Sequence, residues 1–145
     1  FIFGGDGDVR TYEKLADELG ICDKCRFIGW AAGEKKDEAF QNSSIFCLPS
    51  KNEGMPMSVL EAMSYGLATI ATPVGGVPQI INDGVNGFLS PVGDVTALAE
   101  KLDVLMSDNA LKERIGKCGR ACIEESFSLD AYMDQIDTIY EIIRK

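Results

Sequence analysis

The stretch PSKNEGMPMSVLEAMSYG occupies residues 49–66 and directly follows the short apolar run IFCL at residues 45–48. A brief apolar run bounded by polar and turn residues is typical of a buried β-strand. Pro56 suits the first position of a helix, because its missing amide proton would have no partner there in any case. The stretch therefore predicts a strand, a loop over residues 49–55 and a helix that starts near Pro56.

Outside this segment the chain repeats the same alternation of short apolar strands and amphipathic helices. Further strands are predicted at residues 1–3, 25–30, 67–71 and 87–89. Further helices are predicted at residues 9–19, 34–42, 77–81, 94–107, 110–126 and 129–144. Asp8 is expected to cap the first of these helices and Gly20 to end it. Alternation over the first 90 residues predicts an α/β fold with a Rossmann-like parallel sheet and helices on both faces.

The composition is that of a globular domain and excludes several classes of site. The 145 residues contain no internal repeat and no linker, so a single domain over 1–145 is predicted. With 14 basic and 23 acidic residues the net charge is −9, which argues against nucleic acid or an anionic membrane as a partner. The chain has no histidine, which excludes within it a Ser-His-Asp or Cys-His nucleophile and a histidine-ligated metal.

The five cysteines are expected to be free thiols, which is typical of a reducing, cytoplasmic location. Cys22 and Cys25 form a C-x-x-C pair, but zinc sites need a second pair of ligands and the chain offers neither another such pair nor a histidine. We therefore expect no metal and no redox role at this pair.

The predicted helix at Pro56 has the features of an anion-binding end. The amides of Met57, Ser58 and Val59 would point out of the helix N-terminus, which binds phosphate readily. Two carboxylates, Glu53 and Glu61, stand eight positions apart across the junction of loop and helix. They would contact different parts of one extended ligand, or they would only stabilise the helix dipole. These residues alone leave both interpretations open.

The pattern P-S-x-x-E-G-x-P-x-S-x-L-E-A-M-x-x-G resembles the signature of the group 1 glycosyltransferases. These are retaining GT-B enzymes with an E-x7-E motif that use nucleotide-diphospho-sugar donors. The resemblance continues along the chain in F-x-F-G-G-D-G (1–7), R-F-I-G-W (26–30), A-T-P-V-G-G-V-P (71–78), N-D-G-x-N-G-F-L (82–89) and F-S (127–128). It implies that the chain is the C-terminal, donor-binding half of a GT-B fold.

The resemblance also implies roles for the two glutamates. Glu53 would be the catalytic residue, hydrogen-bonding hydroxyls of the transferred sugar and stabilising charge near its anomeric carbon. Gly54 would contact the sugar through its backbone, and Glu61 would accept hydrogen bonds from the ribose hydroxyls. The three helix amides would hold the diphosphate.

Three residues earlier in the chain would complete the donor site. By the resemblance, Trp30 and Ala31 would border the nucleotide base through backbone atoms, and the Lys36 side chain would reach the nucleotide. The donor would be a UDP-, GDP- or ADP-sugar, transferred with retention in a hexosyltransferase reaction to a glycan, lipid or other acceptor. No cofactor is expected. No divalent metal is expected either, because no Asp-x-Asp or similar cluster accompanies the donor loop.

The chain departs from the family pattern in two ways. The family's Arg and Lys that neutralise the diphosphate lie before the position of Phe1, and so does the acceptor-binding domain. The chain is therefore expected to be a fragment, truncated at its N-terminal edge and inactive alone, whose parent would meet a membrane only peripherally and only through the missing N-terminal domain. Gln79 also stands where the family often has Glu.

Two alternatives and one ambiguity remain at the level of sequence. A sugar-nucleotide epimerase on the same fold matches the E-x7-E pattern less closely. A non-catalytic flavodoxin-like binding or regulatory domain would typically carry a phosphoacceptor Asp at a strand end, where this chain has Gly4, Trp30, Pro49 and Thr72. The apolar stripe of the final helix is expected to pack in the core or, by the resemblance, to reach the N-terminal domain.

Overall fold

The computed structural model describes residues 1–144, which separate by their internal contacts into two compact units. The first unit ends at Asn42 and the second starts at Ser43. The sequence predicts a single domain over residues 1–145, and the division into two units does not test that prediction.

The first unit is a pair of parallel strands with helices. Its elements are β1 (Ile2–Gly4), α1 (Val9–Glu18), the short 3-10 helix η1 (Cys22–Lys24), β2 (Arg26–Gly29) and α2 (Glu34–Gln41). Strand β1 pairs with β2 in parallel, with Phe3 opposite Phe27 and their rings stacked 5.0 Å apart. Asp8 caps α1 as predicted, because its carboxylate accepts hydrogen bonds from both the amide and the hydroxyl of Thr11.

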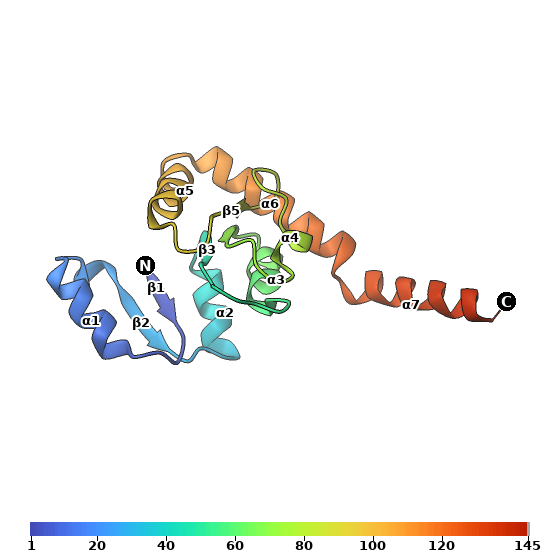
Figure 1. The fold of residues 1–145 in the computed structure, drawn as a ribbon, viewed down its shortest axis with the longest axis horizontal. Helices are drawn as coiled ribbons and strands as arrows, with labels where there is room; N and C mark the ends of the chain where they lie inside the picture. Colours follow the sequence, from blue (N-terminus) through green and yellow to red (C-terminus); the bar gives the residue numbers. More distant parts are fainter. Residues whose placement is uncertain (145) are drawn as a thin grey trace. The chain divides into compact units, whose positions relative to one another are not determined.

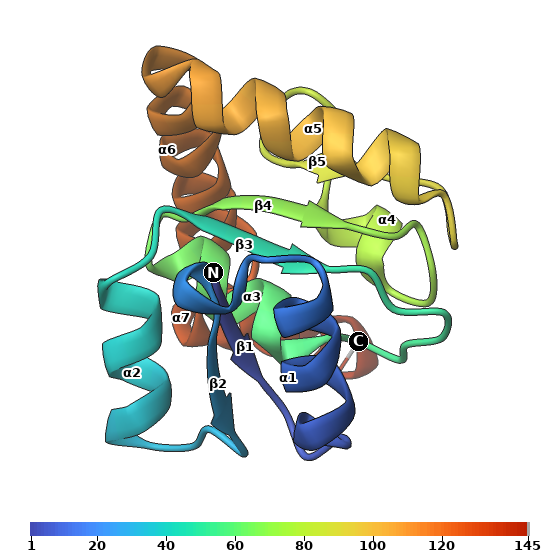
Figure 2. The ribbon, with the colours of Figure 1, turned by 90° about the vertical axis from the view of Figure 1, so that its left-hand side faces the viewer.

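The second unit contains a three-stranded parallel sheet. Its elements are β3 (Ile45–Leu48), α3 (Met57–Ser64), β4 (Ala68–Ala71), α4 (Val77–Ile80), β5 (Phe88–Leu89), α5 (Val95–Ser107), α6 (Asn109–Ser126) and α7 (Leu129–Ile143). The strand order is β3-β4-β5, so the central strand β4 pairs on both edges. Figure 2 shows β3 and β4 side by side and running in the same direction.

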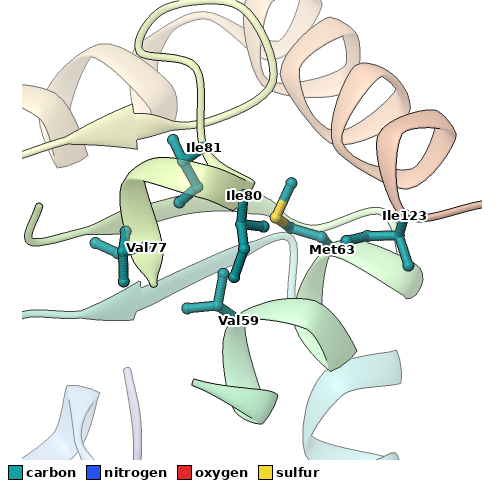
Figure 3. Packing of buried hydrophobic residues seen from close by; sticks show 7 residues of the cluster. Val59, Met63, Val77, Ile80, Ile81 and Ile123 are labelled. Atoms are coloured by element: carbon teal, nitrogen blue, oxygen red, sulfur yellow. The ribbon is translucent and has the colours of Figure 1, made fainter. Parts of the chain in front are cut away.

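Side chains of β4 alternate between two cores, one on each face of the sheet. On one face Ala71 packs in a cluster with residues of α3, α4 and α6 and with the residue that follows α4, which are Val59, Met63, Val77, Ile80, Ile123 and Ile81 (Figure 3). On the other face Ala68 and Ile70 pack against Leu105 of α5 and Ile115 of α6. The period of two places successive side chains on opposite faces. The predicted α/β class, with parallel strands and helices on both faces, is confirmed.

Helix α6 approaches the end of α3 closely because it carries glycine where they meet. A Cβ atom on Gly116 would clash with the carbonyl oxygen of Gly66, two residues after α3 ends at Ser64. A Cβ on Gly119 would lie 3.0 Å from the carbonyl oxygen of Asn86. The contact of Gly116 with Gly66 thus packs α6 against the turn that follows α3.

The final helix α7 contributes nothing to the buried core. None of residues 129–143 is buried, and the apolar side chains Leu129 and Ile143 are 74% and 73% exposed. In Figure 1 α7 runs away from the rest of the second unit. The expectation that its apolar stripe packs in the core is therefore wrong for this chain. Across residues 1–144, none of the helices combines the length and apolar character that crossing a membrane requires.

Candidate functional site

Two loops of the second unit meet at the carboxyl edge of its sheet. Residues 49–56 connect β3 to α3, and residues 72–76 connect β4 to α4. Because β3 and β4 are parallel neighbours, both loops leave the same edge, which is where ligands bind in such sheets. The Gly76 amide donates to the carbonyl oxygen of Gly54 at 2.6 Å. A Cβ on Gly75, whose φ is +55°, would clash with the carbonyl oxygen of Glu53.

The Glu53 carboxylate is held by a hydrogen bond from a neighbour in its own loop. The Ser50 hydroxyl donates to Glu53 Oε1 at 2.6 Å, and both residues are half-buried. The Thr72 hydroxyl donates in turn to the carbonyl oxygen of Ser50 at 2.5 Å, and Thr72 is only 2% exposed. Thr72, at the buried end of β4, therefore holds this loop through the carbonyl oxygen of Ser50.

Helix α3 begins four positions after Glu53, and its N-terminus carries no side-chain cap. Pro56 is the capping residue with extended backbone (φ −75°, ψ 101°), so it stands one position before the place predicted for it, and α3 begins at Met57. The Val59 amide donates to the carbonyl oxygen of Pro56 at 3.0 Å. Within residues 1–144 the amides of Met57 and Ser58 have no hydrogen-bond partner. Two of the three predicted amides are thus available to an anion at the positive end of the helix dipole.

Glu61 lies in the second turn of α3 and is half-buried. The same loop and helix therefore carry Glu53, Gly54, the two available amides and Glu61 in sequence. The fold holds this helix firmly, because Val59, Ala62 and Met63 are completely buried beneath it. The arrangement can present two carboxylates and a helix N-terminus to one extended ligand, since all of them lie on one rigid segment.

The other predicted residues belong to the first unit. Trp30 and Ala31 follow the carboxyl end of β2 directly, and Trp30 is 70% exposed. Lys36 lies in the first turn of α2, which starts after Gly33, and it is half-buried. The structure thus places Trp30 and Ala31 after β2 and Lys36 on α2, all within the first unit, whereas both glutamates belong to the second unit.

Two hollows of the structure are lined by other residues than those predicted for the donor site. A hollow of about 440 Å³ lies between α4 and α6 in the second unit, and one of about 110 Å³ lies in the first unit. None of the predicted donor-site residues lines either hollow. Among residues 1–144, no group of three or more cysteine, aspartate or glutamate side chains is arranged to hold a metal ion.

Ser50, Thr72 and Gly75 are site residues that sequence reasoning missed. The P-S and A-T-P-V-G-G segments that contain them were visible as parts of the resemblance. Their contacts were not visible, because the bond between Thr72 and Ser50 spans 22 positions and depends on how β3 pairs with β4.

Comparison with known proteins gives matches over most of the chain. A family model described as "Glycosyl transferases group 1" matches residues 1–121. The N-acetyl-alpha-D-glucosaminyl L-malate synthase of Bacillus anthracis is 34% identical over 140 residues, which are 94% of this chain and 35% of that protein.

Two solved structures have a similar fold. The C-terminal domain of a glycosyl transferase group 1 family protein (LpcC) from Francisella tularensis gives a TM-score of 0.76 at 30% identity, over 83% of this chain and 62% of that one. Anabaena HepE in complex with UDP gives a TM-score of 0.85 at 22% identity, over 97% of this chain and 40% of that one. The chain thus spans only part of each protein, and the likeness to HepE concerns the fold alone.

Proposed function

The chain belongs to the glycosyl transferases group 1 family, and from this membership we propose that it is the donor-binding domain of a retaining glycosyltransferase. The donor is a nucleotide-diphospho-sugar, and the reaction is of the hexosyltransferase type, with a glycan, lipid or other acceptor. The observation that carries this proposal is the loop and helix at the edge of the second unit's sheet. There the Ser50 hydroxyl holds Glu53, and a helix N-terminus with two available amides begins four positions later.

Each part of that segment suits one part of the donor. The amides of Met57 and Ser58, with the helix dipole, suit the negative diphosphate. Glu53 precedes them and contacts hydroxyls of the sugar, while Glu61 follows them and accepts from the ribose. In the reaction Glu53 then stabilises the positive charge that develops at the anomeric carbon as the bond to the diphosphate breaks.

The residues of the first unit are proposed to bind the nucleotide. Trp30 and Ala31 border the base through backbone atoms, and Lys36 reaches the nucleotide with its side chain. For this chain UDP, GDP and ADP remain equivalent candidates.

We further propose that transfer needs a second, acceptor-binding domain. The chain covers 35% of the Bacillus anthracis relative, so the relative has room for such a domain. The isolated chain is expected to bind nucleoside diphosphates weakly and to transfer no sugar, because the cations that stabilise the leaving diphosphate belong to the missing part. We propose a cytoplasmic enzyme that needs neither cofactor nor divalent metal, and that meets a membrane only through its other domain.

Calorimetric titration of the chain with UDP, GDP, ADP and their sugars tests the proposal. We expect weak binding of one nucleotide class, which Glu61→Gln weakens further. Glu100→Gln is the matched control, because it makes the same charge change at an exposed position of α5. Absence of binding by the folded chain at millimolar ligand would contradict the assignment of the donor site. Sub-micromolar binding would contradict the proposed need for cations from elsewhere.

A further inference from the structure

We propose that Ser50 is a positioning residue for Glu53 and that the buried Thr72 holds Ser50 in place. This inference rests on the proposed function, in which Glu53 contacts the sugar. Ser50 itself touches neither donor nor acceptor in this proposal. It acts by fixing the direction in which the Glu53 carboxylate points.

The hydrogen bond between the two side chains is short and partly shielded. Ser50 Oγ donates to Glu53 Oε1 at 2.6 Å, which is a normal length for a hydroxyl donating to a carboxylate. Such charge-assisted bonds are roughly twice as strong as neutral ones. Within residues 1–144, Glu53 Oε2 accepts no hydrogen bond, so one oxygen is held while the other is available to sugar hydroxyls.

The support for Ser50 comes from two paired strands. Ser50 lies two residues after β3 ends at Leu48, and Thr72 lies one residue after β4 ends at Ala71. Leu48 and Ala71 are partners in the sheet, and the Thr72 amide donates to the carbonyl oxygen of Leu48 at 3.3 Å. The Thr72 hydroxyl then donates to the Ser50 carbonyl oxygen. The position of Ser50 is therefore set by the sheet rather than by a mobile loop.

The backbone of Glu53 is fixed independently of its side chain. The Gly76 amide donates to the carbonyl oxygen of Gly54, and Gly75 lies against the carbonyl oxygen of Glu53. Loss of the Ser50 hydroxyl should therefore free the carboxylate without moving the loop. A misplaced catalytic group costs up to about 100-fold in rate, so a fully folded variant is expected to show a catalytic defect.

Kinetics of Ser50 variants in the enzyme that carries this domain test the inference. We expect Ser50→Ala to lower kcat by about 10- to 100-fold while the inhibition constant of the nucleoside diphosphate product stays within about twofold, because the nucleotide does not contact Glu53. Ser50→Thr keeps the hydroxyl and should restore most of the loss. Ser107→Ala is the control, since that exposed hydroxyl donates only to backbone carbonyls of α5.

A double-mutant cycle separates positioning from a general structural role. In a Glu53→Ala background, Ser50→Ala should cause no further loss, because the group that it positions is gone. Thr72→Val should reproduce the kcat defect and Thr72→Ser should relieve it, which gives a second route if Ser50→Ala folds poorly. Thermal unfolding of every variant accompanies the kinetics.

The possible outcomes distinguish this inference from the function on which it rests. If Glu53→Gln lowers kcat but Ser50→Ala leaves it unchanged, the positioning role is wrong and the proposed function stands. The positioning role is also wrong if Ser50→Ala weakens nucleotide inhibition as much as it lowers kcat, or if its cost persists without Glu53. If Glu53→Gln itself leaves kcat unchanged, the assignment of Glu53 and the positioning role are both overturned.

Discussion

Gly75 lies so close to Glu53 that only a hydrogen atom fits between the Gly75 Cα and the carbonyl oxygen of Glu53. The loop after β4 therefore limits where the backbone of Glu53, the proposed catalytic residue, can lie. Gly75 also has a φ of +55°, a conformation that costs a residue with a Cβ about 1–2 kcal/mol. Two independent constraints therefore require glycine at this position.

Gly75→Ala is expected to destabilise the second unit by more than the ~1–2 kcal/mol of backbone strain alone, because the added methyl group must also displace the Glu53 backbone. Gly84→Ala is the matched control, since Gly84 has a φ of +75° but no atom within 4 Å of the place that an added methyl group would take. Urea unfolding measures both. Equal losses in the two variants would show that the contact with Glu53 has no energetic weight.

Glu53 and Glu61 are expected to differ in what they bind. In the complete enzyme Glu53→Gln should lower kcat strongly and leave the affinity for the nucleoside diphosphate nearly unchanged. Glu61→Gln should weaken nucleotide and sugar donor alike, by about 1.5–3 kcal/mol for a lost hydrogen bond to a charged group. Steady-state kinetics with product inhibition measure both effects. Near-wild-type kinetics in both variants would mean that the two carboxylates only stabilise the helix dipole.

Cys47 is expected to be the slowest of the thiols to react. Burial raises the pKa of Cys47 from 9.0 to about 11, so its reactive thiolate is scarce near neutral pH. Cys22, by contrast, is exposed. Mass spectrometry after brief alkylation at pH 8 should find Cys22 modified long before Cys47, and the difference should vanish in urea. Equal native rates would contradict the burial of Cys47.

The same pKa shift gives a pH dependence of stability with a definite sign. The folded chain holds the Cys47 proton more tightly than the unfolded chain does, so the free energy of unfolding should fall as pH rises from 9 to 11. Cys47→Ala should remove this contribution. Urea unfolding at several pH values compares the slopes of the two proteins.

Removal of divalent metal is expected to leave activity intact. The donor loop, residues 49–56, contains a single carboxylate, Glu53, which the proposed reaction uses on the sugar. The complete enzyme assayed after EDTA treatment should therefore keep its kcat. Activity that is lost in EDTA and returns with Mg²⁺ or Mn²⁺ would show that a metal holds the diphosphate.

Much of the fold could be predicted because its signals are local. The run at residues 45–48 is apolar and short, and β3 has those bounds. Asp8 and Gly20 flank α1 where the capping rules place them. Pro56 shows the limit of such rules, because a proline serves equally before a helix or at its first position, and only the backbone angles decide.

The missed features depend on hydrogen bonds and packing that the local pattern of residues does not specify. The sequence around Ser50 does not show that its carbonyl oxygen meets the Thr72 hydroxyl, since that follows from the register of β3 with β4. The amide of Val59 was expected to be available, but a tight first turn directs it to Pro56. The exposure of α7 could not be predicted from the sequence either, because an apolar stripe indicates that a face is covered but not which part of a protein covers it.

Because β4 lies between two strands and two cores, its amide protons should exchange later than those of other parts of the second unit. All four residues of β4 are at most 1% exposed, and both edges of the strand are hydrogen-bonded to neighbours. Amide protons of β4 are expected to exchange with solvent only when the unit opens globally, whereas α7, without a buried residue, should open on its own. Isotope exchange should therefore begin in the C-terminal helix and reach β4 last.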